Sequence, residues 1–134
     1  MPILYEQKPG TILLCDYGLG GFRPPEMVKR RPVVVVSKRK RQPTGLLTVV
    51  PLSTSEPLPL EAYHCRIALE VPLPGFAEQE CWVKADMVAT VAFARLDMFQ
   101  TAREPSGKRK YLTRRVSTDQ LEQIRSCLRA VLGI

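Results

Sequence analysis

The sequence predicts a mainly β fold (α+β) with one C-terminal helix, in which short antiparallel strands form a small, strongly bent barrel. Two observations support this. Short apolar or alternating segments follow one another between proline- and glycine-rich connections, and the C-terminal segment has the spacing of an amphipathic helix. With 134 residues, no repeat and no linker, the chain is expected to form one domain over residues 1–134, with an N-terminal arm at 1–10.

The predicted strands are separated by clear connections. Apolar or alternating residues predict strands at 11–16, 32–37, 46–52, 64–71, 81–84 and 88–93. A second hairpin is expected around a polar tip at 103–110, with 111–116 as its returning strand. The glycines and prolines of 17–31 predict a long loop, and 53–62 is proline-rich and irregular.

The C-terminal segment 117–133 has a complete helix signature. Ser117 and Gln120 form a capping box, Asp119 suits the positive end of the helix dipole, and Gly133 ends the segment. The apolar residues recur on one helix face: Leu121, Ile124, Leu128, Val131 and Leu132. This face is expected to pack on the sheet.

A paired arginine precedes the most apolar strand. In KRRPVVVVS (29–37), Pro32 favours extended backbone at Arg31 and belongs at the first position of a strand. Arg30 and Arg31 are therefore expected at the rim of a sheet, anchored by four valines. A guanidinium held in this way is suited to meet a phosphate.

Three segments together resemble a known family. KRRPVVVVS, VVPLS (49–53) and CWVKAD (81–86) occur in the order and rough spacing of the MazF/PemK (Kid-like) ribonuclease toxins, and the resemblance covers residues 10–134. It implies an SH3-like barrel, commonly a homodimer. It further implies a type II toxin that cleaves single-stranded RNA without metal or cofactor, leaving 2′,3′-cyclic phosphate and 5′-hydroxyl ends. A cognate antitoxin would inhibit it.

Arg31 and Ser53 are the first two candidate catalytic residues. The planar fork of Arg31 suits the charge of a phosphorane, and the matching arginine of the family is regarded as central to catalysis. Ser53 stands where the family carries threonine or serine, and its hydroxyl could hold the scissile phosphate. The alternatives are that Arg31 only solvates a strand end and that Ser53 or Thr54 only caps a turn.

Lys84 and Asp86 form a second candidate pair. Residues two apart in a strand share a face, so the two are expected side by side, with Asp86 as base and Lys84 binding phosphate. The Kid-like branch has Arg-x-Asp here and often a following glutamine, so Lys84 and Met87 depart from the family pattern. A surface ion pair without functional role is the alternative.

His64 and the cysteines complete the set of reactive side chains. Histidine is the side chain whose chemistry suits proton transfer near neutral pH, and His64 is a candidate substrate-binding residue, although a lone histidine is more often structural. No metal site is predicted, because the four cysteines form no CxxC pair and only one histidine adjoins them. Buried reduced thiols are expected instead.

Positive charge is concentrated in two segments. The net charge is +7; residues 29–41 hold seven of the twenty Lys and Arg, and residues 103–115 hold six, with Glu104 as the one acid in these segments. Such clusters suit a polyanion, and Arg30, Lys38 and Arg39 are candidate RNA-binding residues. The alternatives are a solvated basic surface or an acidic protein partner.

Two functions therefore remain in view. The first is the ribonuclease toxin; the second is a non-catalytic SH3-like module that binds nucleic acid or an acidic protein. The chain has no transmembrane-length apolar run and its N-terminus lacks the pattern of a signal peptide, so a cytoplasmic protein without membrane contact is expected.

Overall fold

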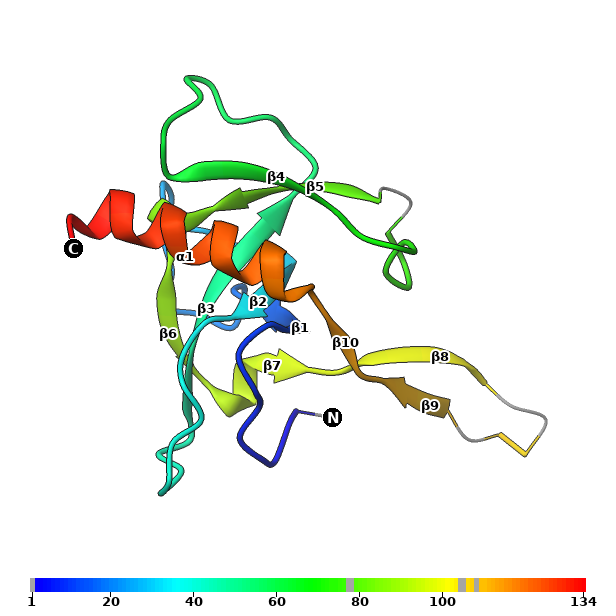
Figure 1. Cartoon of the computed structure of the whole chain (residues 1–134). Helices are drawn as coiled ribbons and strands as arrows, with labels where there is room; N and C mark the ends of the chain where they lie inside the picture. The colour runs from blue at the N-terminus through cyan, green and yellow to red at the C-terminus, as the bar shows by residue number, and fades with distance from the viewer. Residues whose placement is uncertain (1, 77–78, 104–105, 108) are drawn as a thin grey trace.

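The computed structural model describes residues 2–76, 79–103, 106–107 and 109–134. The elements run β1 (Thr11–Asp16), β2 (Arg30–Val35), β3 (Leu46–Ser53), β4 (His64–Ala68), β5 (Glu80–Lys84), η1 (Ala85–Met87), β6 (Ala89–Ala92), η2 (Phe93–Arg95), β7 (Leu96–Asp97), β8 (Phe99–Arg103), β9 (Arg109–Leu112), β10 (Arg114–Arg115) and α1 (Thr118–Leu132). The expected mainly β fold with a C-terminal helix is confirmed (Figure 1).

The main sheet is antiparallel and strongly bent. Its order is β10-β1-β2-β3-β5-β4, and β8 and β9 form a separate hairpin. The first half of β3 pairs with β6 and its end pairs with β5, while β1 pairs with β10 at its start and with β7 near its end. Because β1 and β3 each change partner along their length, the sheet curls. Hydrogen bonding does not close it within the described ranges, since β4 and β10 are its end strands.

The apolar residues form two core clusters. Ile12, Val34 and Val50 belong to the cluster that includes Ile124 and Cys127 of α1, whereas their neighbours in the strands belong to the second cluster. Successive strand residues point to opposite faces. The valines of β2 are all fully buried, although successive side chains point to opposite faces of the sheet. Burial on both faces explains why this strand is a continuous apolar run.

The capping of α1 follows the sequence prediction. The Ser117 hydroxyl accepts a hydrogen bond from the Gln120 N–H at 3.1 Å, and the Gln120 side chain accepts from the Ser117 N–H at 3.0 Å. Gly133 takes the left-handed conformation (φ 70°) that ends the helix.

Three details of the strand prediction are wrong. β2 begins at Arg30, so Pro32 is its third residue and not its first. Pairing of β2 with β3 begins only at Val33, so the proline lies just outside the hydrogen bonds between these two strands. β4 ends at Ala68, three residues earlier than expected. The second hairpin begins at Phe99, and the expected polar tip is partly strand; residues 104, 105 and 108 of that tip lie outside the described residues.

The N-terminal arm packs against the sheet. The Ile3 N–H donates to the Leu96 carbonyl at 2.8 Å, and the Ile3 side chain is buried. Across the part of the chain that the structure describes, no helix has the length and apolar character needed to span a membrane.

Candidate active site

Arg31 and Ser53 share a small pocket. Arg31 is near the start of β2 and Ser53 ends β3. Because the two strands pair antiparallel, these two residues lie at the same end of the β2–β3 pair. The pocket has a volume of ≈ 50 Å³, and its lining residues are Arg31, Pro32, Leu52, Ser53, Thr54, Leu73, Phe76 and Cys81. The Arg31 Nε is buried and has no hydrogen-bond partner among the residues that the structure describes. This buried donor is therefore unsatisfied within the described part of the chain.

The Ser53 hydroxyl also has a structural role. Its oxygen accepts a hydrogen bond from the Ser55 N–H at 3.1 Å, and the residue is 7% exposed. This contact is the turn cap that the sequence offers as the alternative role of Ser53. A serine hydroxyl that accepts one hydrogen bond keeps its own proton to donate. Capping and phosphate binding by Ser53 are therefore compatible.

His64, Lys84 and Asp86 lie together at a second pocket. His64 starts β4 and pairs in register with Lys84 at the end of β5. The pocket has a volume of ≈ 250 Å³, and its lining residues are Pro57, Leu58, Pro59, Glu61, Tyr63, His64, Lys84, Asp86 and Met87. Both pockets border β5, because Cys81 lines the first and Lys84 the second.

The contacts of His64 orient Asp86. The His64 Nδ1 accepts a hydrogen bond from the Glu61 N–H at 3.1 Å, so the proton of the neutral ring is on Nε2. The Nε2 lies 3.5 Å from the Asp86 Oδ1, with side-chain exposures of 7% for His64 and 38% for Asp86. A buried imidazole thus faces a carboxylate that solvent and substrate can reach.

The expected strand geometry of Lys84 and Asp86 is wrong. β5 ends at Lys84, and Asp86 lies in the 3-10 turn η1, where the Val88 N–H bonds to the Ala85 carbonyl at 3.1 Å. The chain turns here because β5 and β6 pair with successive segments along one edge of β3, and η1 joins these two pairings. The two side chains nevertheless line one pocket, with His64 as the partner of Asp86.

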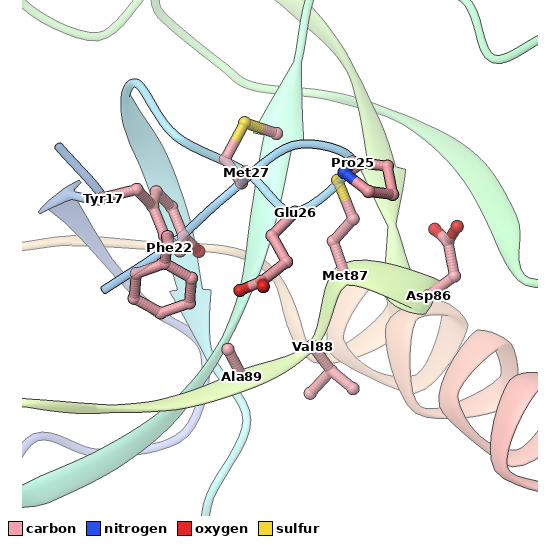
Figure 2. Close-up of a pocket in the computed structure, with 9 residues that line it drawn as sticks. All are labelled: Tyr17, Phe22, Pro25, Glu26, Met27, Asp86, Met87, Val88 and Ala89. Carbon is pink, nitrogen blue, oxygen red and sulfur yellow. The ribbon is translucent and has the colours of Figure 1, made fainter. Parts of the chain in front are cut away.

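A third pocket lies between loop 17–29 and the segment 86–89 (Figure 2). Its volume is ≈ 380 Å³, and it is lined by Tyr17, Phe22, Pro25, Glu26, Met27, Asp86, Met87, Val88 and Ala89. Asp86 therefore borders both the second and the third pocket. Loop 17–29 is the long connection expected from its glycines and prolines, and no strand or helix interrupts it.

The structure separates three candidate RNA-binding residues from this site. Arg30 points away from Arg31, as neighbours in a strand do, and lines a different pocket with Asp97 and Gln100. Lys38 and Arg39 follow the other end of β2, whose span from Arg31 to Val35 alone covers roughly 13 Å. Figure 1 shows the β2–β3 loop and the β3–β4 loop at opposite ends of β3.

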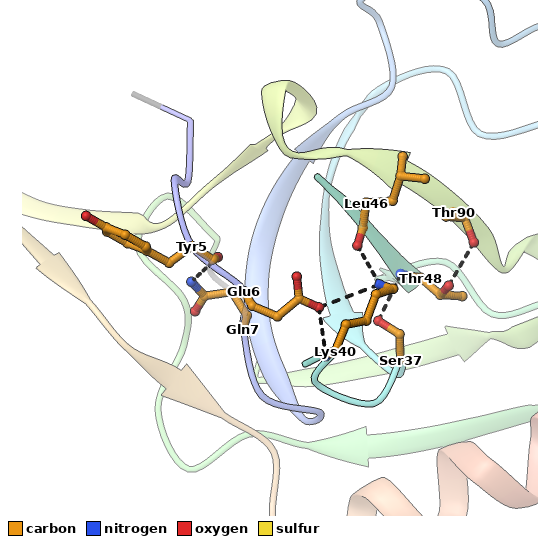
Figure 3. Close-up of polar contacts among 8 residues, drawn as sticks. All are labelled: Tyr5, Glu6, Gln7, Ser37, Lys40, Leu46, Thr48 and Thr90. Carbon is orange, nitrogen blue, oxygen red and sulfur yellow. Dashed lines mark hydrogen bonds and ion pairs between the residues drawn. The ribbon is translucent and has the colours of Figure 1, made fainter. Parts of the chain in front are cut away.

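Part of the basic charge stabilises the fold. The Lys40 Nζ lies 3.5 Å from the buried Glu6 carboxylate and donates to the Leu46 carbonyl at 2.8 Å (Figure 3). Arg114 donates to the Val71 carbonyl at 2.8 Å, and Arg115 to that of Pro9 at 3.2 Å. These three cations are therefore less available to a polyanion than their sequence clusters indicate.

The thiols are largely buried. Cys15, Cys81 and Cys127 are buried, Cys65 is partly so, and all four are reduced thiols. Burial raises the pKa of Cys15 and of Cys65 from 9.0 to about 12, so both remain protonated at neutral pH. Within the described ranges, no group of three or more His, Cys, Asp or Glu side chains is arranged to hold a metal ion.

Sequence reasoning missed several pocket residues. Leu73 and Phe76 line the Arg31 pocket, and Tyr63 packs its ring against His64 at 4.6 Å between centroids. Glu26 belongs to the third pocket. No local pattern identifies these residues, because strand register and loop course bring them to the site.

Comparison with known proteins now decides the family. The family described as "PemK-like, MazF-like toxin of type II toxin-antitoxin system" matches residues 8–132. The chain belongs to this family. The resemblance of the three sequence segments is thereby confirmed.

Relatives and solved structures agree with this family. An uncharacterised protein of Haemophilus influenzae is 35% identical over 103 residues, which are 69% of this chain and 70% of that protein. The fold is similar to an endoribonuclease in complex with its cognate antitoxin from a mycobacterial species, with TM-score 0.61, 21% identity and 96% of each chain covered. It is also similar to MazF from Deinococcus radiodurans, with TM-score 0.60, 20% identity and coverage of 97% and 99%.

Proposed function

We propose that this PemK/MazF-family chain is an endoribonuclease toxin that cleaves single-stranded RNA without a metal ion. The observation that carries the proposal is the buried, unpartnered Nε of Arg31 in a pocket shared with Ser53. A desolvated guanidinium with a free donor stabilises developing negative charge far more strongly than a solvated one. Family membership and the fold of the endoribonuclease neighbours support the same function.

The proposed reaction is an attack of the ribose 2′-hydroxyl on the adjacent phosphorus. Asp86 takes the 2′-hydroxyl proton, and His64 positions it through the Nε2–Oδ1 contact of 3.5 Å. Arg31 stabilises the phosphorane and Ser53 donates its hydroxyl proton to a phosphate oxygen, while Lys84 binds a neighbouring phosphate. The bond to the 5′-oxygen then breaks, that oxygen takes a proton from solvent and Asp86 returns its own proton to solvent, which gives a 2′,3′-cyclic phosphate and a 5′-hydroxyl end.

Two partners besides RNA belong to this proposal. A cognate antitoxin with an acidic segment would be attracted by the basic surface of the chain, and complementary charge would offset the cost of ordering that segment. We also propose a homodimer, as is common in the family. The antitoxin is consistent with the complex of the mycobacterial neighbour with its own antitoxin.

A non-catalytic binding module is the second candidate function. It is favoured by the departures at Lys84 and Met87 and by the exposed charges of Lys38, Arg39 and Arg41. Lysine lacks the bidentate geometry of arginine at a phosphate, which would weaken catalysis before it weakened binding. Such a module would hold RNA without turnover.

The deciding experiment is incubation of the purified chain with a long unstructured RNA in excess EDTA, followed by analysis of fragment ends. Fragments with cyclic phosphate and 5′-hydroxyl ends support the proposal. Intact RNA that is retained in a gel shift contradicts it and favours the binding module.

A further inference from the structure

The pocket between loop 17–29 and the segment 86–89 has the features of a ligand site. Its volume of ≈ 380 Å³ lies at the lower end of the range for small-molecule pockets, which suits a single planar group. Phe22, Met27 and Val88 give it apolar walls, and two carboxylates border it. Stacking surfaces combined with a few polar groups are how proteins bind an unstacked nucleobase.

The Glu26 carboxylate is free to bind a ligand. Figure 2 shows it pointing into the space between Phe22 and Ala89. The residue is exposed, and no ion pair holds its carboxylate among the residues that the structure describes. A carboxylate repels phosphate but accepts two parallel N–H donors, so the group that enters here carries donors and no negative charge.

A buried hydroxyl lines the same pocket. Tyr17 is 1% exposed, and its hydroxyl oxygen has no strong hydrogen-bond partner within the described ranges; the Cys15 thiol is beside it. Burial raises the pKa of Tyr17 above its ordinary value, so the hydroxyl keeps its proton. It can therefore donate to an acceptor that enters the pocket.

The position of the pocket links it to the proposed reaction. Asp86 lines both this pocket and the one that holds His64 and Lys84. A base bound between Glu26 and Asp86 therefore belongs to a nucleotide next to the phosphate that reacts. Arg95 fixes the loop that forms the wall, since it donates to the Gly20 carbonyl at 2.6 Å and covers the Phe22 ring at 4.8 Å.

We propose that this pocket selects a guanine beside the scissile phosphate, with Glu26 as the residue that determines the specificity. This inference rests on the proposed ribonuclease function. Guanine alone presents two adjacent donors, N1–H and N2–H, to one carboxylate, and its O6 beside them is an acceptor for the Tyr17 hydroxyl. Adenine and cytosine offer one amino group beside an acceptor, and uracil one N–H between two acceptors.

The test uses oligonucleotides that cannot be cleaved. Uridine-rich 2′-O-methyl oligonucleotides carrying a single guanine, inosine or adenine are titrated with the full chain, and affinity is read by fluorescence anisotropy. Wild type is expected to prefer guanine over adenine by roughly 5- to 150-fold, the range for one bidentate pair. Inosine, which lacks the N2 amino group, is expected between them.

Two matched variants complete the test. Glu26→Gln keeps the shape of the side chain and is expected to abolish the preference, whereas Glu70→Gln, at another exposed glutamate, is expected to retain it. Equal affinity of wild type for all three oligonucleotides overturns the inference. A guanine preference that survives Glu26→Gln overturns it as well.

The two proposals can fail separately. A guanine preference that depends on Glu26, in a protein that leaves the unmodified RNA uncut, supports the base pocket and refutes the nuclease. For an active protein, the fragment ends from a randomised RNA pool are expected to share a guanine at one fixed position in wild type and to lose it in Glu26→Gln.

Discussion

The Arg95 Nη2 donates to the Gly20 carbonyl at 2.6 Å, which joins the turn η2 to a loop 75 residues earlier in the chain. The same guanidinium donates to the Asp16 carbonyl at 3.2 Å and lies 4.8 Å from the centre of the Phe22 ring. The Arg95 side chain thus contacts the residue just before loop 17–29 and two positions within the loop. The shape of the third pocket depends on this arrangement.

Arg95→Ala is expected to release the loop. It removes two hydrogen bonds from a charged donor and one cation–π contact, so the free energy of unfolding should fall by roughly 1–2 kcal/mol. Limited trypsin digestion should also cut faster at Lys29. Arg125→Ala is the control, because that arginine forms an exposed pair with Glu122, and its loss should change stability little. Equal trypsin resistance of wild type and Arg95→Ala would show that the loop is held by other contacts.

Lys40→Ala is expected to destabilise the fold more than Arg41→Ala. Glu6 is 8% exposed, and its Oε1 has Lys40 as ion-pair partner at 3.5 Å, while Oε2 is buried without a partner within the described ranges (Figure 3). Removing the lysine leaves a buried charge uncompensated, which should cost roughly 2–4 kcal/mol in urea unfolding. Glu6→Gln in the Lys40→Ala background should recover part of the loss. Equal effects of Lys40→Ala and Arg41→Ala would contradict this.

Stability is expected to decrease at alkaline pH. The pKa of the Cys15 thiol rises from 9.0 to about 12 on folding, so the folded chain keeps a proton that the unfolded chain releases above pH 9. The contribution is fully present below pH 9 and is lost as the pH rises toward 12. Between about pH 8 and about pH 10 the free energy of unfolding should fall by about 1 kcal/mol from this thiol. Cys15→Ala should flatten this part of the profile; an unchanged slope would exclude the thiol as its source.

His64→Ala is expected to slow RNA cleavage without weakening RNA binding. The imidazole contacts Asp86 and is itself held by the Glu61 N–H, so its loss frees the carboxylate to rotate. Misplacement of a catalytic group by about 1 Å lowers kcat by roughly 10- to 100-fold. The measurement is kcat and KM on one defined RNA. A raised KM with unchanged kcat would instead place His64 in substrate binding.

The sequence predicted those parts of the fold that local patterns control. The capping box of Ser117 and Gln120 and the valine run of β2 depend on residues close in the chain, and both are found as expected. The expectation that Lys84 and Asp86 share one strand face was wrong because the turn after β5 accompanies a change of partner along β3, which no local pattern encodes. Strand order is likewise not a local property.

The same distinction applies to the candidate site. Arg31 and Ser53 could be paired from the sequence because their motifs flank two strands of one hairpin. Lys40 could not be separated from its basic neighbours, since its partner Glu6 is 34 residues away and buried. Glu26 and Tyr17 meet segment 86–89 only through the course of a long loop. Their role in a pocket is visible only in three dimensions.

The central claim is that Arg31 acts in catalysis rather than in RNA binding. It is tested most directly by single-turnover cleavage of one defined RNA in EDTA, with affinity for its 2′-O-methyl analogue measured in parallel, for wild type, Arg31→Ala and the control Arg129→Ala. We expect Arg31→Ala to cut roughly 100- to 1,000-fold more slowly while binding RNA within a few-fold of wild type. Full cleavage by Arg31→Ala, or a loss of affinity that accounts for all of the lost activity, would contradict the claim.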